Sequence, residues 1–147
     1  MGVNREMIDA SVRFESVSVG DGLPGLDVPL TTSLIVSTAI ASRDFTPVHH
    51  DNKAAQQSGV GDVFMNILTT NGFVGRYVTD WAGPDARIAS VAIRLGTPNM
   101  PGDTMRMSGT VKSRDATAGT VEVDVIGANA WGNHVTGSVV VELPRGA

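Results

Sequence analysis

The chain contains no cysteine, so disulfide bonds, thiolate nucleophiles and cysteine-ligated zinc sites are all excluded. Charged residues make up only 18% of the chain and the net charge is -4, which argues against a basic surface for nucleic acid. No apolar run reaches the roughly 18 residues of a membrane span, and residues 1–11 lack a signal-peptide core. We therefore expect a soluble, cytoplasmic protein with neither nucleic acid nor membrane as its partner.

The length of the chain indicates one domain. With 147 residues, 41% of them hydrophobic, it can fill one substantial core but not two. No repeat, low-complexity segment or linker divides it. We expect a single domain over residues 1–147, with residues 1–10 poorly ordered because they follow no hydrophobic period.

The first half of the chain favours short elements separated by turns. Residues 11–19 predict a first strand, and the glycines and prolines of residues 20–29 predict an irregular segment after it. Residues 31–40 favour a helix with a threonine cap, with a strand that runs into a helix as the alternative. Asp51 predicts the cap of another short helix, which Ser58-Gly59 would end.

A longer amphipathic helix is predicted between Phe64 and Trp81, where apolar residues recur at spacings of three and four. We expect it to be the most buried helix. Its two glycines, Gly72 and Gly75, indicate that another backbone or a ligand lies very close.

The last third of the chain changes to a period of two, which predicts half-buried strands. Together with the helices, these strands indicate an α+β fold in which an antiparallel sheet is covered by the long helix. The strands are expected around residues 88–95, 105–111, 121–125 and 135–143, with turns at residues 116–119 and 132–133.

The segment from Arg43 to Asp51 carries the strongest chemical signal. Asp44 and His49 are separated by Pro47, which prevents a regular helix and lets a loop turn both side chains toward one point. A carboxylate and an imidazole that hold one water can take a proton from it and return a proton to a substrate. This spacing is typical of acid-base chemistry.

The same segment resembles the signature of the MaoC family of (R)-specific enoyl-CoA hydratases, which runs Gly-Asp-x-Asn-Pro-aliphatic-His. Asp44, Pro47, Val48 and His49 match it, Ala55 occupies the small position that follows, and Pro101-Gly102-Asp103-Thr104 resembles a second family turn. The resemblance covers residues 11–143. It implies a hot-dog fold, in which an antiparallel sheet wraps around a long helix, and it makes Asp44 and His49 the catalytic pair.

The chain departs from the family pattern at three places. Arg43 replaces a glycine, Thr46 replaces an asparagine, and Met65-Asn66 replaces a His-Gly pair whose glycine amide helps to form an oxyanion hole. The backbone amide of Asn66 can still donate there. We expect Asn66 to contact the substrate, together with Val63, Asn71 and Gly72.

Two further segments, the doubled histidine at His49-His50 and residues 76–84, are similar to the small subunits of actinobacterial hydratases that act on CoA esters of shortened cholesterol side chains. This resemblance implies an acyl-CoA substrate and a partner, a larger MaoC-like subunit without the catalytic pair. The expected assembly is a heterotetramer of two small and two large chains, or otherwise a homodimer. It implies no metal and no redox cofactor.

Other interpretations remain open from the residues alone. The chain could be a non-catalytic hot-dog subunit or an acyl-CoA thioesterase. A metal site at His49, His50 and Asp51 is rejected because consecutive side chains point in different directions. The remaining expectations are a structural hydrogen bond for His50, solvent exposure for His134, and core or interface positions for Trp81 and Trp131.

Overall fold

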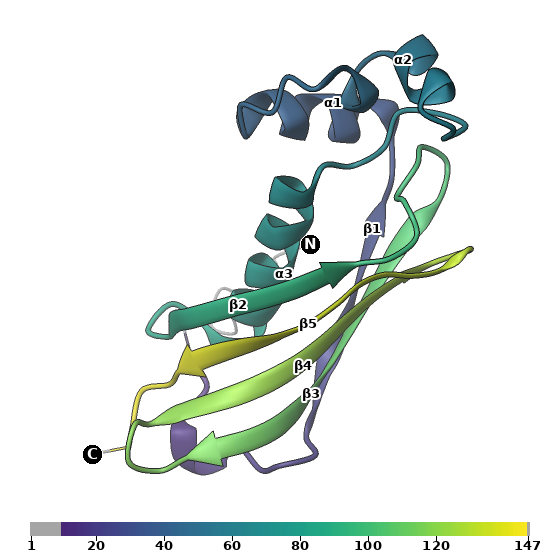
Figure 1. Ribbon diagram of the computed structural model, residues 1–147. Coiled ribbons are helices and arrows are strands. Elements are labelled where there is room, and N and C mark those ends of the chain that lie inside the picture. Colours follow the sequence, from purple (N-terminus) through teal and green to yellow (C-terminus); the bar gives the residue numbers. More distant parts are fainter. Residues whose placement is uncertain (1–9, 147) are drawn as a thin grey trace, which may run out of the picture.

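The computed structural model describes residues 10–146, in which five antiparallel strands form one curved sheet (Figure 1). The strand order is β1-β3-β4-β5-β2, which places β1 and β2 at the two edges. The strands are β1 (Gly22–Pro29), β2 (Arg87–Leu95), β3 (Thr104–Asp115), β4 (Thr120–Asn129) and β5 (Gly132–Glu142). Residues 1–10 are predicted to be poorly ordered, and residues 1–9 of this segment lie outside the described residues.

The period of two in the last third is confirmed. On β4, Val121, Val123 and Val125 are buried, whereas Asp124 between them is exposed. The predicted turn at residues 116–119 is also present. The second predicted turn is wrong by two residues, because the chain turns at Ala130-Trp131 and β5 already begins at Gly132. Asn129 accounts for this position, since its Oδ1 accepts a hydrogen bond from the N–H of Trp131 (2.9 Å).

The predicted first strand at residues 11–19 is wrong. That segment contains a short 3-10 turn, η2 (Phe14–Ser16), and the strand is formed by the next residues, Gly22–Pro29. Two features let a sequence rich in glycine and proline form this strand. β1 lies at a sheet edge and pairs only with β3, and its register shifts between Leu23 and Leu26, around the Pro24-Gly25 pair.

The long helix α3 (Ile67–Ala82) runs along one face of the sheet and contacts β1, β2 and β5 (Figure 1). Val74, Val78 and Ala82 are fully buried against the sheet, as the helical period predicts. Ile67 and Leu68 in its first turn are 50% and 52% exposed, so the predicted apolar stripe is wrong at that end. The first turn faces a pocket instead of the sheet, and Ile67 lines that pocket.

No backbone lies close to the glycines of α3, contrary to that part of the prediction, whereas a ligand close to them stays a prediction. A Cβ atom at Gly72 would meet no atom within 4 Å, and one at Gly75 would make an ordinary 3.7 Å contact with Ile88. The two predicted capped helices are present as α1 (Thr32–Ala41) and α2 (Asn52–Gln57), with the side chains of Thr31 and Asp51 as their caps.

Of the two tryptophans, Trp81 packs against the core and Trp131 is 70% exposed at the β4-β5 turn. Within residues 10–146, no helix has the length and hydropathy needed to cross a membrane.

Candidate active site

The end of α1 places Asp44. The N–H of Arg43 donates to the carbonyl of Ile40 and the N–H of Asp44 donates to the carbonyl of Ala39, both at 2.9 Å. This pair of bonds is the Schellman motif, which requires a left-handed residue between the helix and the residue that follows. Arg43 takes that conformation with φ 59°. The motif therefore turns the chain sharply and presents Asp44 at the end of the helix.

Arg43 stands where a glycine is favoured, because a side chain in the left-handed region costs about 1 kcal/mol. We expect Arg43→Gly to raise the free energy of unfolding by about 1 kcal/mol. Urea unfolding of the variant and the parent measures the difference. Arg43→Ala is the matched control, since it removes the same side chain but keeps the Cβ atom. Equal stability of the glycine and alanine variants would contradict the assigned strain.

His49 ends the 3-10 turn η3 (Pro47–His49), which Pro47 begins. His49 is 8% exposed, and its ring meets the Phe64 ring edge-on at a centroid distance of 4.9 Å. His49 Nδ1 lies 2.7 Å from the carbonyl oxygen of Phe64. A carbonyl only accepts, so Nδ1 carries the hydrogen, and in the neutral ring Nε2 keeps a free lone pair.

The carboxylate of Asp44 is held by three donors. Its Oδ1 accepts from the hydroxyl (2.7 Å) and the N–H (3.2 Å) of Thr46, and its Oδ2 accepts from Nδ2 of Asn66 (3.1 Å). The Thr46 hydroxyl lowers the pKa of Asp44 most, followed by the Asn66 amide and the Thr46 N–H. Asp44 is therefore ionised at neutral pH.

Nε2 of His49 and Oδ2 of Asp44 face each other at 3.5 Å. This distance is too long for a good direct hydrogen bond, and with neutral His49 both atoms are acceptors. One water molecule that donates a hydrogen to each of them satisfies both. The Asp44–His49 pair is thus arranged to hold a water whose oxygen lone pair points away from both side chains.

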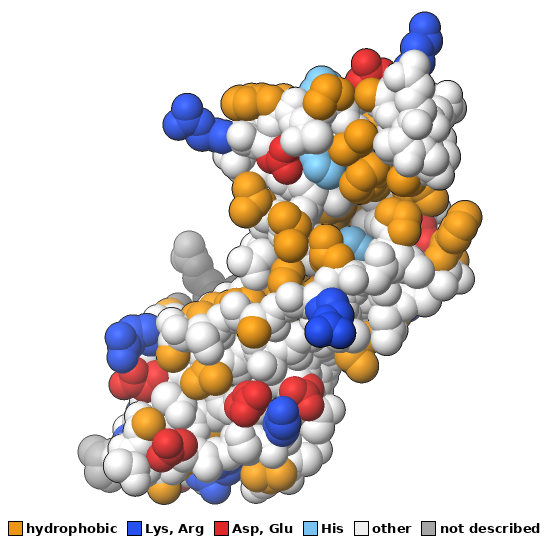
Figure 2. All heavy atoms as spheres, in the orientation of Figure 1, with side chains coloured by type: hydrophobic (Ala, Val, Ile, Leu, Met, Phe, Trp, Pro, Cys, Tyr) orange, Lys and Arg blue, Asp and Glu red, His pale blue; other side chains and the backbone are white. Residues whose placement is uncertain are grey.

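The Asp44–His49 pair opens into a pocket of about 370 Å³. The other walls come from the start of α3, the segment after β2 and the start of β5, and they are mostly apolar. The residues that line it are Asp44, His49, Phe64, Met65, Ile67, Leu95, Gly96, Thr97, Pro98 and His134. Figure 2 shows hydrophobic side chains gathered on the upper half of one face, around the visible histidines.

His134 was expected to be exposed, and this prediction is wrong. It is 2% exposed, its Nδ1 donates to the carbonyl of Thr97 (2.7 Å), and its Nε2 accepts from the hydroxyl of Thr70 (2.8 Å). The β4-β5 register shifts at Gly127/Ala128, where the pairing passes from Asn133 to Val135. This bulge turns His134 inward together with Val135, which no simple alternation predicts.

Burial lowers the pKa of His134, so the folded protein keeps this ring neutral. As the pH falls below about 6.5, the unfolded chain binds a proton before the folded chain does, and stability is lost. We expect the free energy of unfolding to fall between pH 7.5 and pH 5.5, and to fall less in His134→Asn, whose amide can still donate to Thr97. Urea titrations at both pH values test this, and equal pH dependence of the two proteins would contradict it.

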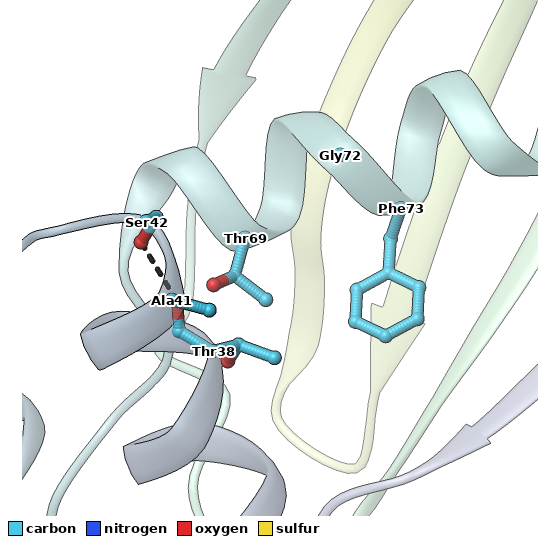
Figure 3. Close-up of a pocket in the computed structure, with 6 residues that line it drawn as sticks. All are labelled: Thr38, Ala41, Ser42, Thr69, Gly72 and Phe73. Atoms are coloured by element: carbon cyan, nitrogen blue, oxygen red, sulfur yellow. Dashed lines mark hydrogen bonds between the residues drawn. The ribbon is translucent and has the colours of Figure 1, made fainter.

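The remaining expected contact residues lie in different places. Asn66 is 1% exposed and touches Asp44, whereas Val63 is buried in the core. Asn71 is exposed on α3. Gly72 lines a separate groove between α1 and α3 (Figure 3), with Thr38, Ala41, Ser42, Thr69 and Phe73. Sequence reasoning missed His134, Thr70, Ser42 and the pocket wall formed by residues 96–98 after β2. No motif in the sequence gives a signal for any of them.

The two residues that follow His49 in the chain have structural roles, as predicted. His50 Nε2 donates to the carbonyl of Phe45 (3.2 Å), and Asp51 caps α2 by accepting from the N–H of Lys53 (2.9 Å) and of Ala54 (3.3 Å). Among residues 10–146, no three histidine or acidic side chains are grouped to hold a metal ion.

Comparison with known proteins gives consistent matches. The family model described as MaoC like domain matches residues 15–129. The 3-oxo-4,17-pregnadiene-20-carboxyl-CoA hydratase beta subunit of Mycobacterium tuberculosis is 47% identical over 125 residues, covering 85% of this chain and 95% of that protein.

Solved structures agree with the sequence matches. A chain of the ChsH1-ChsH2 complex from M. tuberculosis has a TM-score of 0.83 at 47% identity, covering 86% of this chain and 98% of that chain. The (R)-hydratase from A. caviae involved in PHA biosynthesis has a TM-score of 0.78 at 21% identity, and the match covers 88% of this chain and 99% of that chain. The α+β hot-dog fold expected from the sequence is confirmed.

Proposed function

The chain belongs to the MaoC-like domain family, and from this premise we propose that it is the catalytic subunit of an enoyl-CoA hydratase. It adds water to a trans-2-enoyl-CoA and gives a 3-hydroxyacyl-CoA. The observation that carries the proposal is the pair of acceptors, Asp44 Oδ2 and His49 Nε2, 3.5 Å apart at the wall of an apolar pocket. Steroid side-chain CoA esters are the proposed substrates, because the M. tuberculosis relative is named as a hydratase of such a thioester.

The reaction begins with a water that donates to both members of the Asp44–His49 pair. As its oxygen bonds to the β-carbon, one O–H bond breaks and the proton goes to the pair. We assign Nε2 of His49 as the acceptor, because it keeps a free lone pair when Nδ1 donates to the Phe64 carbonyl, and because the lowered pKa of Asp44 makes its carboxylate the weaker base. The ionised Asp44 then stabilises the imidazolium beside it. The same Nε2–H delivers the proton to the α-carbon, which completes the addition of water.

Between these steps the thioester oxygen carries negative charge as an enolate. Ile67, the first residue of α3, lines the pocket, and Asn66 directly precedes it. Backbone N–H groups at a helix N-terminus stabilise such a charge, so we assign the amides of Asn66 and Ile67 to this role. Neither a metal ion nor a redox cofactor takes part in the proposed reaction. A cytoplasmic location stays a prediction.

A partner subunit completes the site in this proposal. Phe45, Ile67, Leu68 and Leu95 are large hydrophobic residues that are 38% to 61% exposed, and Ile67 and Leu95 line the pocket. The edge strand β2 leads into the pocket wall at Gly96. An apolar surface beside an open sheet edge fits a second hot-dog chain. The matched M. tuberculosis chain comes from a complex, and we propose a heterotetramer with a larger MaoC-like subunit.

Loss of the enoyl-thioester absorbance tests the function, with a steroid side-chain enoyl-CoA as substrate. The chain is measured alone and then with a candidate larger subunit. We expect hydration that depends on both chains. Release of free CoA thiol, detected with a thiol-reactive dye, would instead indicate a thioesterase, and full activity of the larger subunit alone would make this chain a scaffold. The absence of cysteine keeps the dye background from this chain low.

A further inference from the structure

The side chain of Asn66 connects α1, α3 and Asp44. Its Oδ1 accepts from the N–H of Thr69 (3.2 Å), which caps α3. Its Nδ2 donates to Oγ of Ser42 (2.9 Å) and to Oδ2 of Asp44 (3.1 Å). The side chain is almost completely buried, so these three contacts use its acceptor and both of its amide hydrogens.

The orientation of this amide is determined by its neighbours. The N–H of Thr69 can only donate, so the oxygen of Asn66 must face it. The hydroxyl of Ser42 donates to the carbonyl of Thr38 (2.7 Å) and therefore offers a lone pair to Asn66. Nδ2 is thus left with one hydrogen for Asp44. The capped helix start and the end of α1 together hold the donor in place.

We propose that the Asn66 side chain is a positioning residue for hydration, which holds Oδ2 of Asp44 beside Nε2 of His49. This inference rests on the proposed function. Carboxylate torsions are broad and nearly two-fold, so a donor on each oxygen is needed to fix the plane of the group. Thr46 fixes Oδ1 and Asn66 fixes Oδ2. Thr46 and Asn66 both differ from the residues of the family pattern, and the side chains of both donate to Asp44.

The charged and titratable groups around Asp44 are few. His49 of η3 faces it directly, and His134 of β5 lines the same pocket. Arg43 precedes Asp44 in the chain and is exposed. A new carboxylate at position 66 would therefore act mainly on Asp44 and His49. It would favour the protonated form of both groups, which raises the pH at which activity is lost.

The decisive variant is Asn66→Asp, because aspartate has the same shape as asparagine and caps a helix equally well. It replaces the donor to Asp44 by an acceptor. We expect kcat to fall about 10- to 100-fold with little change in KM, because a small misplacement of a catalytic group is costly. The acid limb of kcat/KM should move up by about one pH unit. Asn66→Ser, which keeps a capping oxygen and shortens the donor, should lower kcat by a smaller factor.

Thr31→Asp is the matched control, since it also puts a carboxylate at a helix N-cap, but on the exposed start of α1. All variants are measured in the active assembly, and their thermal midpoints are compared. Unchanged kcat and an unchanged acid limb in Asn66→Asp would overturn the proposal and leave Asn66 as a helix cap only. Failure of the proposed function is distinguishable, because Asp44→Asn would then keep its activity as well.

Discussion

Asp44→Asn should lower kcat/KM for hydration by about a thousandfold, within the usual range for losing a group that acts on a proton in the transition state. The substitution keeps the size of the side chain, but it removes the negative charge that orients the water and stabilises the His49 imidazolium. The Schellman motif at the end of α1 uses the backbone of residue 44, so the chain can still place the new side chain correctly. The rate of loss of the enoyl-thioester absorbance measures the effect.

Asp27→Asn is the control for this variant, because it makes the same chemical change on an exposed position of β1. It should keep full activity. Thermal unfolding of both variants separates loss of chemistry from loss of fold. If Asp44→Asn retained near-normal turnover in the assembled complex, the catalytic pair would have to lie in the other chain.

The elements that the sequence predicted well depend on local patterns. Three strands alternate every two residues. A loop with Pro47 must bend wherever it lies, so the sequence predicted that Asp44 and His49 turn toward one point, and their side chains lie 3.5 Å apart. Threonine and aspartate caps are equally local, as Thr31 and Asp51 show. Each of these features is decided by residues within a few positions of one another.

The elements that it missed depend on distant neighbours. Gly22–Pro29 forms a strand because β3 pairs with it, although glycine and proline favour a turn. His134 is buried because a register shift between β4 and β5 turns it inward, and the shift exists only in the paired sheet. Asn66 contacts Asp44 because α1 ends where α3 begins, which no spacing along the chain reveals.

The second large effect concerns His49. His49→Asn keeps an amide that can donate to the carbonyl of Phe64, but it has no atom at the place of Nε2. We expect a loss of kcat of about 100-fold or more, because the group that accepts the proton is gone. His50→Asn is the neighbouring control and should be nearly neutral, since His50 is exposed and its side chain bonds only to the Phe45 carbonyl among the residues that the structure describes.

The double variant Asp44→Asn/His49→Asn tests whether the two residues act as one unit. Nε2 and Oδ2 are 3.5 Å apart and are proposed to hold the same water, so removing either one already releases it. The double variant should therefore be about as active as the less active of the two single variants, as expected when two residues serve one step together. Losses that multiply would mean that Asp44 and His49 contribute independently, and the single-water geometry would be wrong.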